Sequence, residues 1–538
     1  MKVIKGVAVC NGIAIGNVFY HEKTVLDIPD TLSTNPDAEW KQCSDAISQA
    51  DKHLEKLYHQ TLETIGSAEA EIFDMHRLML ADEDFCDAIK AKIYDEGLNV
   101  LKAIHEAGIE FAALFEQLDD EYMQARAVDV HDVSGLLKEI IAGVPKREKL
   151  EVPSVIFAWD LTPSETVQMD KENILGFVTQ KGSSTSHTAI LARTMGIPSI
   201  VQADFLQQDI TTDMLVAVDG YEGVCYLAPD DSTLATLKEK QKREAEFKLE
   251  CEAVRGLPSI TKSGKAISVY ANIGNNEDIS SVLENDAEGI GLFRSEFLYL
   301  GRTSPPSEEM QFAAYKNVAE KMNGKKVIIR TMDIGADKQA DYLGIQPEEN
   351  PALGYRAIRI CLDRPELFQT QLRAICRASA FGNVSVMFPM ICSIWEIREC
   401  KKALLAAQES LKKENISYGE MEIGIMIETP AAVILRDEFA KEVDFFSVGT
   451  NDLTQYTLAA DRQNQRLERY ADPHHPAILE MLRLISESAV NNGIWAGICG
   501  ELAGDFTLTE KFIQMGYGEL SVAPPMVLPL RKHIREKS

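Results

Sequence analysis

The stretch EIGIMIETPAAVILRDEFAKEVDFFSVGTND, residues 422–452, decides the fold of the C-terminal half of the chain. It holds two short apolar runs, 422–428 and 443–449, separated by a helical segment. Short apolar runs that alternate with helical segments are typical of β/α units around a parallel sheet. One run ends at Glu428 and the other is followed by Asn451 and Asp452. We therefore expect these side chains at the carboxyl ends of neighbouring strands.

The same alternation continues through the whole region after residue 258. The eight apolar runs are AISVYANI (266–273), GIGLF (289–293), KVIIRTM (326–332), VSVMFPM (384–390), EIGIMIE (422–428), VDFFSVG (443–449), GIWAGIC (493–499) and LSVAP (520–524). Eight β/α units in about 280 residues predict a (β/α)8 barrel, whose catalytic groups lie at the carboxyl ends of the strands. A doubly wound sheet is the alternative.

The N-terminal half changes its periodicity twice. Residues 1–20 read as a strand pair, and short β runs return over 152–228. Between them, over 37–143, apolar residues recur every three, four or seven positions, which is typical of helices. We expect one β/α domain interrupted by a helical insertion. Residues 230–255 contain neither Gly nor Pro and are highly charged, which predicts a linker helix.

Composition limits the class of protein. With 45% hydrophobic and 26% charged residues the chain matches soluble globular proteins. A formal charge of −28 argues against nucleic-acid binding and favours a basic protein partner. The ten cysteines are scattered without a C-x-x-C pair, which predicts reduced thiols and a cytoplasmic location. No run of 18 apolar residues occurs, and Asn11 and Gly12 interrupt the apolar N-terminus, so we expect neither membrane insertion nor a secretion signal.

Several arginines follow the apolar runs of the predicted barrel. Arg294 and Arg330 come directly at strand ends, and Arg356 and Arg462 add to them. Each alone is more often an ordinary ion-pair partner. Guanidinium forks suit carboxylate and phosphate, so the set together predicts an anionic substrate.

Glu428 and Asp452 follow adjacent strands and offer hard oxygen ligands. Magnesium is usually held by one or two carboxylates, completed by water and substrate phosphate. The two carboxylates could instead neutralise the arginines. Because one rim carries both signs of charge, the sequence favours a metal-phosphate site.

Two further residues are candidates for chemistry. Cys499 ends the seventh apolar run beside cationic groups, so its thiol is a candidate to give or take a proton, although an unpaired cysteine is most often a small buried hydrophobe. His187 begins a predicted helix in GSSTSHTAILAR (182–193), where amides attract anions and an imidazole can accept a phosphoryl group. A helix cap or an acid–base group is the alternative role for His187.

Seven blocks of this sequence together resemble one known family. They are DLTPSET (160–166), TSHTAILAR (185–193), GIGLFRSEFLYL (289–300), IRTMDIGADK (329–338), ENPALGYRAIR (349–359), VGTNDLTQYTLAADR (448–462) and CGELAGD (499–505). In this order they resemble the phosphoenolpyruvate-protein phosphotransferase family, enzyme I of the bacterial sugar phosphotransferase system. The resemblance covers nearly the whole chain.

The resemblance implies an α/β chain with a C-terminal (β/α)8 barrel and an N-terminal swivelling β/α phosphohistidine domain carrying an inserted helical bundle. The implied segments are the phosphohistidine domain (1–20 and 146–228), the insertion that binds the phosphocarrier protein HPr (21–145), the linker helix (229–258) and the phosphoenolpyruvate-binding barrel (259–538). A homodimer through the barrel is also implied.

The family's functional residues map onto this sequence one by one. His187 would be phosphorylated, with Thr166 orienting it, and Cys499 would protonate the enolate to give pyruvate. Glu428 and Asp452 would bind Mg2+. The residues implied to hold phosphoenolpyruvate (PEP) are Arg294, Arg330, Arg356, Asn451, Asp452 and Arg462.

The sequence departs from the family pattern in places. Ser183 and Ser184 stand where the family usually has glycine and arginine, Ala336 replaces a common glycine, and His131 stands where arginine is frequent. Two other functions therefore stay open. One is a catalytically weakened regulatory paralogue that only binds HPr, and the other is a barrel enzyme that uses PEP without phosphorylating a protein.

Overall fold

We obtained a computed structural model of the chain. It describes residues 1–538 except 23–25, 65–66, 117–120, 145–149, 151, 170–172, 183–186, 337, 339 and 463. The chain divides into two compact units, Met1–Glu246 and Phe247–Ser538, and each has its own buried apolar cores.

The C-terminal unit is a closed barrel of eight parallel strands in the order β10-β11-β12-β13-β14-β15-β16-β9. The strands are β9 (Ser268–Ile273), β10 (Gly289–Arg294), β11 (Lys326–Arg330), β12 (Val384–Phe388), β13 (Ile423–Ile427), β14 (Phe445–Val448), β15 (Trp495–Ile498) and β16 (Glu519–Val522). Each of the eight apolar runs contains or overlaps one strand, so the barrel prediction is confirmed and the doubly wound alternative is wrong.

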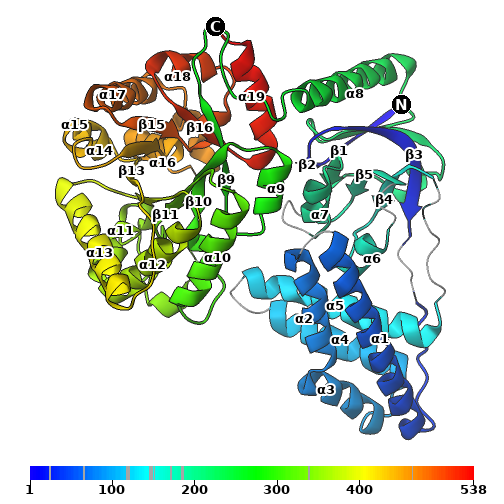
Figure 1. Cartoon of the computed structure of the whole chain (residues 1–538). Coiled ribbons are helices and arrows are strands. Elements are labelled where there is room, and N and C mark those ends of the chain that lie inside the picture. Colours follow the sequence, from blue (N-terminus) through cyan, green and yellow to red (C-terminus); the bar gives the residue numbers. More distant parts are fainter. Residues whose placement is uncertain are drawn as a thin grey trace. The chain divides into compact units, whose positions relative to one another are not determined.

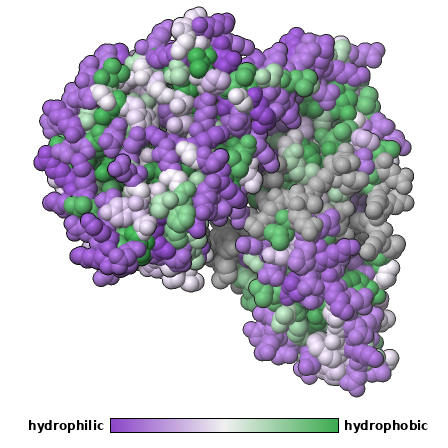
Figure 2. Space-filling model, viewed as in Figure 1, coloured by the Kyte–Doolittle hydropathy of each residue, from purple (hydrophilic) through white to green (hydrophobic). Residues whose placement is uncertain are grey.

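Helices surround these strands (Figure 1). They are α9 (Ile279–Glu284), α10 (Glu308–Lys321), α11 (Ile358–Asp363), α12 (Pro365–Ala378), α13 (Ile394–Lys413), α14 (Pro430–Ile434), α15 (Arg436–Phe439), α16 (Thr450–Leu458), α17 (Pro476–Asn492), α18 (Thr509–Met515) and α19 (Val527–Glu536). Local sequence fixes their ends: Ser393 and Glu396 form a capping box that starts α13, and Gly493 (φ 72°) ends α17 in the left-handed region. In Figure 2 the exposed face of this unit is mainly hydrophilic, because the apolar sides of the helices pack on the barrel.

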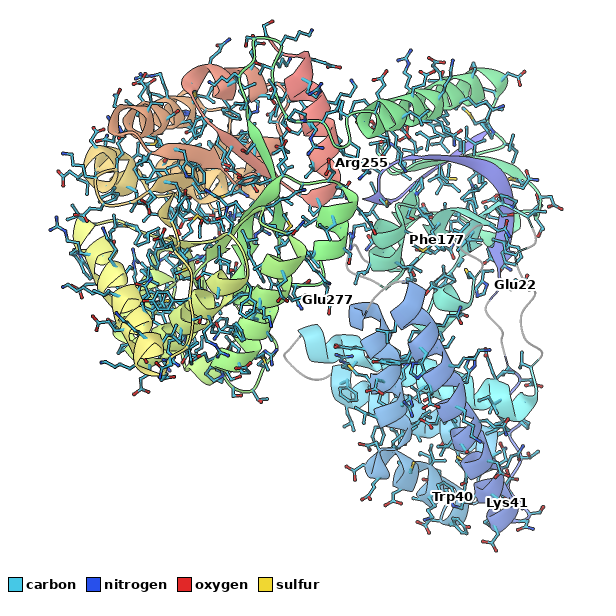
Figure 3. All side chains as sticks on the ribbon, viewed as in Figure 1. Glu22, Trp40, Lys41, Phe177, Arg255 and Glu277 are labelled. Atoms are coloured by element: carbon cyan, nitrogen blue, oxygen red, sulfur yellow. The ribbon has the colours of Figure 1, made fainter. Side chains whose placement is uncertain are left out.

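The N-terminal unit contains an eight-stranded sheet in the order β1-β8-β7-β3-β4-β5-β6-β2. Its strands are β1 (Lys2–Lys5), β2 (Val7–Cys10), β3 (Ile13–His21), β4 (Ser154–Ala158), β5 (Ile174–Thr179), β6 (Ser199–Val201), β7 (Leu215–Asp219) and β8 (Val224–Leu227). Two short helices, α6 (Pro163–Gln168) and α7 (His187–Met195), connect strands of this sheet. Phe177 of β5, labelled in Figure 3, is only 1% exposed and belongs to the apolar core.

The expected strand pair at the N-terminus is wrong. Residues 1–21 form three strands, β1 to β3, and no two of these three pair with each other. Instead β1 pairs with β8, β2 with β6, and β3 with β4 and β7. The physical reason is Gly6, because a Cβ there would lie 2.5 Å from Ile200 Cγ2 and 2.6 Å from the Val201 carbonyl oxygen. β1 and β2 lie at opposite edges of the sheet, yet only Gly6 separates them in sequence. Because one residue spans only a few ångströms, the sheet must curl so that these two edges come close.

The predicted helical insertion is present between β3 and β4. These strands are parallel neighbours, with Asn17 opposite Ser154, although the insertion separates them in sequence. The inserted helices are α1 (Pro36–Thr64), α2 (Ser67–Leu80), α3 (Glu83–Tyr94), α4 (Val100–Glu116) and α5 (Glu121–Ala142). They enclose their own apolar core, and Figure 3 labels Trp40 and Lys41 on α1. Asn35 caps α1, since its side-chain oxygen accepts a hydrogen bond from the Ala38 amide at 3.2 Å.

The predicted linker helix is α8 (Asp231–Glu252), and the division between the two units falls inside it, after Glu246. Its exposed charges pair along the helix, for example Arg243 with Glu239 at 3.0 Å. Among the helices of the described ranges, none has the length and apolar character that a membrane span needs.

Candidate active site

Most of the candidate residues lie at the carboxyl ends of the barrel strands. Arg294 and Arg330 end β10 and β11, and their Cα atoms are partners in the parallel register. Arg294 is exposed, whereas Arg330 is buried. Glu428 follows β13, Asn451 and Asp452 lie in the first turn of α16 after β14, and Cys499 follows β15.

Arg330 and Arg356 are held by carboxylates that the sequence analysis did not single out. Arg330 pairs with Glu296 and also with Asp333, where Nη1 lies 3.0 Å from Oδ2. The other oxygen of Asp333 accepts a hydrogen bond from Arg356 Nη2 at 2.9 Å. All four residues are at most 6% exposed, so both guanidinium groups are fixed before any substrate binds.

The charge balance of this cluster decides the ionisation of Asp333. Burial alone would raise the pKa of its carboxyl group, but the charges of Arg330 and Arg356 outweigh burial and hold that pKa well below its usual range. Lys338 adds a third cation, because its Nζ lies 3.4 Å from Glu296 Oε1. The cluster therefore contains three cations and two carboxylates, which leaves a positive excess suited to an anion.

Glu428 and Asp452 form a second group beside these arginines. Glu428 is fully buried, and its Oε1 accepts a hydrogen bond from the Met390 amide at 2.6 Å. Its Oε2 and the Oδ1 of Asp452 are buried without any hydrogen bond. Burial, followed by the negative charges of Asp452 and Asp333, raises the pKa of Glu428 to about 8.

Two unsatisfied carboxylate oxygens that repel each other are the donor set a divalent cation needs. Among the described residues no cluster of three or more His, Cys, Asp and Glu side chains is arranged to hold a metal. Glu428 and Asp452 could supply two oxygen ligands to a divalent cation whose remaining ligands come from water and substrate.

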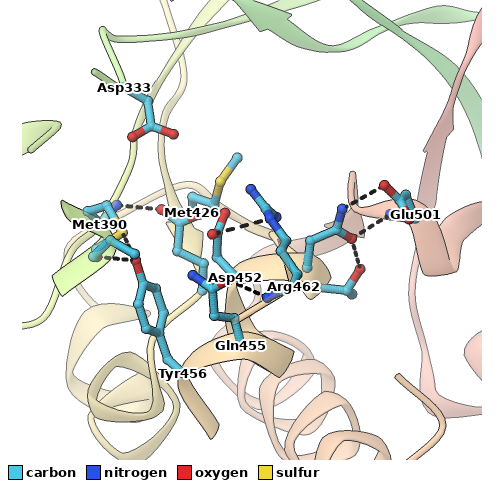
Figure 4. A network of polar contacts seen from close by, with 12 residues as sticks. Asp333, Met390, Met426, Asp452, Gln455, Tyr456, Arg462 and Glu501 are labelled. Atoms are coloured by element: carbon cyan, nitrogen blue, oxygen red, sulfur yellow. Dashed lines mark hydrogen bonds and ion pairs between the residues drawn. The ribbon is translucent and has the colours of Figure 1, made fainter. Parts of the chain in front are cut away.

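Arg462 and Asn451 lie at the more exposed rim of the same mouth. Figure 4 shows Arg462 beside Asp452, with Nη1 3.6 Å from Oδ1. Asn451 and Glu501 exchange two hydrogen bonds, at 3.0 and 3.1 Å (Figure 4). Asn451, Arg462 and Glu501 help to line a cavity of about 540 Å³ at this rim, and its lining does not include the buried groups Arg330, Arg356 and Glu428.

Cys499 lies inside the barrel mouth and is 3% exposed. Its thiol donates to the Val448 carbonyl oxygen at 3.6 Å, and its backbone carbonyl accepts a hydrogen bond from Asn272 Nδ2 at 3.0 Å. Burial raises the pKa of Cys499 to about 12, although the Ser447 hydroxyl acts in the opposite direction. The thiol is therefore protonated at neutral pH and is able to act as an acid rather than as a nucleophile.

Thr166 and His187 belong to the N-terminal unit. Thr166 is buried in α6, and its hydroxyl donates to the Thr162 carbonyl oxygen at 3.1 Å. His187 is the first residue of α7, as predicted, and α6 packs on α7. The His187 side chain and the loop residues Ser183 and Ser184 lie outside the described part of the chain.

The residues that sequence reasoning missed were present in the motifs it quoted. Glu296 lies in GIGLFRSEFLYL, and Asp333 and Lys338 lie in IRTMDIGADK. Glu296 and Asp333 follow a strand end within three residues, so the rule that selected Arg294 and Arg330 could also have selected them, whereas Lys338 lies eight residues after β11.

Comparisons with known proteins agree with this geometry. Three family models match the chain: PEP-utilising enzyme, PEP-binding domain, over residues 248–538; PEP-utilising enzyme, N-terminal, over 5–126; and PEP-utilising enzyme, mobile domain, over 150–223. The fold and the site thus define a PEP-utilising enzyme. The phosphoenolpyruvate-protein phosphotransferase of Staphylococcus carnosus is 41% identical over 99% of this chain and 94% of its own length, and that of Bacillus subtilis is 40% identical over 100% and 95%. The chain belongs to the phosphoenolpyruvate-protein phosphotransferase family.

Proposed function

We propose that this chain transfers the phosphoryl group of PEP to His187 and then to HPr, releasing pyruvate, as the first step of sugar uptake by the phosphotransferase system. The observation that carries the proposal is the fixed pair Arg330 and Arg356 beside the unsatisfied carboxylates Glu428 and Asp452. A docking module that only bound HPr would need neither group, which disfavours the regulatory alternative.

The barrel mouth would bind PEP through its anionic groups. Arg330 and Arg356 are already oriented, and Arg294, Arg462 and Asn451 at the rim complete the set of donors. Preorganised donors of this kind stabilise charge on a transferring phosphoryl group, so positioning supplies most of the rate. Asp452 serves both as a metal ligand and as the partner of Arg462.

Glu428 and Asp452 would hold Mg2+, which when bound would neutralise charge on the phosphate. The two proposed Mg2+ ligands differ in exposure, since Glu428 is fully buried and Asp452 is half-buried. Glu428 must lose its proton to act as a ligand, and Met390 holds its other oxygen in place.

The reaction requires two covalent events. An imidazole nitrogen of His187 attacks phosphorus, the N–P bond forms, and the P–O bond to the enolate oxygen breaks. The thiol of Cys499 then gives its proton to the methylene carbon, so a C–H bond forms and pyruvate leaves. Thr166 would orient the His187 ring from α6.

The segments divide the work. We assign phosphohistidine formation to residues 1–20 and 146–228, HPr docking to the helical insertion (21–145), domain movement to the linker (229–258) and PEP binding to the barrel (259–538). The overall charge of −28 suits a basic HPr surface, because complementary charge speeds encounter. We also propose a cytoplasmic homodimer that associates through the barrel.

The function is tested with PEP labelled in its phosphoryl group. Purified protein with Mg2+ should take up one acid-labile, alkali-stable label per chain and pass it to HPr. His187→Ala should abolish labelling, whereas the control His59→Ala, at an exposed histidine of α1, should still be labelled. Label that appears only as free phosphate would instead support a barrel enzyme that does not phosphorylate protein.

A further inference from the structure

Glu519 is a buried carboxyl group that the mechanism above does not use. It is the first residue of β16, is 2% exposed, and neither of its side-chain oxygens makes a hydrogen bond. A buried carboxyl group without partners is costly, so its retention calls for a physical explanation.

Two glycines make room for this carboxyl group inside the barrel. A Cβ on Gly497 of β15 would lie 1.7 Å from Glu519 Oε2, and a Cβ on Gly291 of β10 would lie 2.4 Å from Oε1. The carboxyl group thus occupies space that any other residue at these positions would fill. It points into the interior rather than toward the surrounding helices.

The strand register places this group near Cys499. Gly497 is the register partner of both Glu519 and Ser447, so the three positions form one layer across β14, β15 and β16. Neighbouring strands lie about 4.8 Å apart, and Gly497 has no side chain, so the Glu519 carboxyl group extends over Gly497 toward Ser447. The Ser447 hydroxyl, like both Glu519 oxygens, is buried without a hydrogen-bond partner among the described residues. Cys499 is two residues beyond Gly497, directly after β15, and it packs in one interior cluster with Met426 and Phe445, one layer nearer the mouth.

A second polar path joins β16 to Cys499. The Ser521 hydroxyl, two residues after Glu519, donates to Asn272 Oδ1 at 2.7 Å. Asn272 Nδ2 in turn donates to the Cys499 carbonyl oxygen at 3.0 Å. These bonds fix Cys499 relative to β16 and keep the two layers in register.

The ionisable groups that face Glu519 favour its protonated form. Burial raises the pKa of Glu519 well above its usual range, and Lys326 of β11 opposes this only in part. Lys326 is itself paired with Glu422 at 2.6 Å. Tyr270 of β9 has its own pKa raised to about 12, by burial and then by the charge of Glu519. Burial therefore favours the protonated form of Glu519.

We propose that Glu519 returns a proton to Cys499, through the Ser447 hydroxyl, after each turnover. This inference rests on the proposed function, in which Cys499 loses its proton to the enolate carbon. The O–H bond of Glu519 breaks and an S–H bond forms on the Cys499 thiolate, while Ser447 accepts one proton and releases another. Solvent water then re-protonates the Glu519 carboxylate.

The proposal predicts different rates of pyruvate formation in the first turnover and in later turnovers of a Glu519 variant. In Glu519→Gln the first turnover uses the proton already on Cys499, so a burst of about one pyruvate per chain should form at the wild-type rate. With excess PEP, Mg2+ and HPr, the steady-state rate should then fall about 10- to 100-fold, because positioned proton transfer contributes on this scale or more. The slow phase should show a larger solvent deuterium isotope effect than wild type.

The matched control is Glu396→Gln. Glu396 is also buried, but it accepts hydrogen bonds from the Cys392 and Ser393 amides at the start of α13. This variant should keep the wild-type ratio of burst to steady-state rate. Ser447→Ala, a smaller change, should reproduce the burst and slow phase of Glu519→Gln and serves if that variant folds poorly.

Two results would overturn the inference while leaving the proposed function intact. One is a steady-state rate of Glu519→Gln within twofold of wild type, and the other is an equal loss in the burst and in the steady state, which would mean a structural role. Failure of the proposed function itself would appear differently, as wild-type protein that takes no label from PEP, and it would overturn both.

Discussion

The raised pKa of Glu428 predicts that Mg2+ binding depends strongly on pH. The metal-free protein holds Glu428 mainly protonated below pH 8, because burial and the charges of Asp452 and Asp333 raise its pKa to about 8. Mg2+ needs the carboxylate, so below pH 8 each pH unit should weaken binding about tenfold, or about 1.4 kcal/mol. Between pH 9 and pH 6 the apparent affinity should fall about 100-fold.

Titration calorimetry in buffers of different ionisation enthalpy measures both the affinity and the proton release. Wild type should release close to one proton per Mg2+ at pH 6 to 7 and almost none at pH 9. Glu428→Gln should bind Mg2+ weakly and without this pH dependence. An affinity for Mg2+ that is flat from pH 6 to pH 9 in wild type would refute the assignment of Glu428 as a buried, protonated ligand.

The same shift has a consequence for stability. Because the folded-state pKa of Glu428 lies above the ordinary value of 4.5, folding favours the protonated form. The metal-free barrel should therefore lose stability as the pH rises from 4.5 to 8, by up to about 5 kcal/mol. Added Mg2+ should restore most of this loss at pH 8, which denaturant unfolding with and without the metal will measure.

Three substitutions test other parts of the site and the barrel. Cys499→Ala should slow pyruvate formation about 10²- to 10⁴-fold in stopped-flow assays while PEP affinity stays the same, and an unchanged turnover would remove Cys499 as the acid. Asp333→Asn removes the carboxylate charge that Arg330 and Arg356 share, leaves Glu296 as the carboxylate paired with Arg330, and should lower the unfolding free energy by about 3 to 5 kcal/mol, with a larger thermal shift on PEP binding than wild type; equal stability would contradict the buried network. Arg531→Met breaks the pair between the buried Arg531 of α19 and the partly exposed Asp286 and should cost about 1 to 3 kcal/mol in denaturant unfolding, so a loss below about 0.5 kcal/mol would show that this pair contributes little.

The barrel could be predicted from sequence because its signal is local and repeated. Each apolar run is short and is followed by a helical segment, and parallel strands buried on both faces are mainly apolar. The positions of Arg330, Glu428 and Cys499 followed from the same rule, since strand ends in this fold meet at one mouth. None of this required knowledge of which side chains touch.

The N-terminal strands could not be predicted in the same way. The pairing of β1 with β8 and of β2 with β6 joins segments about 200 residues apart, and no local pattern encodes such partners. At Gly6 the chain passes from β1 at one edge of the sheet to β2 at the other edge. Sequence periodicity reports that a strand exists, but the close approach to Ile200 and Val201 that requires glycine exists only in the folded sheet.

The carboxylates that pair with the arginines were not predicted from sequence, for a related reason. Arg294 and Arg330, with Arg356 and Arg462 added, predict an anionic substrate because several cations gather at one rim, but the same rim supplies the carboxylates Glu296 and Asp333. Charges buried together must nearly balance, so an arginine that binds substrate in a buried mouth needs a carboxylate to hold it in the free enzyme. The substrate then adds to a network that is already ordered.

Glu519 extends this reasoning to the barrel interior. The eighth apolar run begins at Leu520, and Leu520 and Val522 both pack in the main core between the strands and the surrounding helices. Alternation along a strand then requires Glu519 and Ser521 to face inward. Burying a carboxyl group inside the barrel costs free energy and requires space between the strands. Gly291 and Gly497 provide that space for Glu519, and a function in proton transfer would explain why the group is retained. The inward-facing side chains of Glu519, Ser447 and Cys499 come together only when the barrel is packed. In the proposal they connect the amino-terminal layer of the barrel to the Cys499 sulfur, which must regain its proton after each turnover.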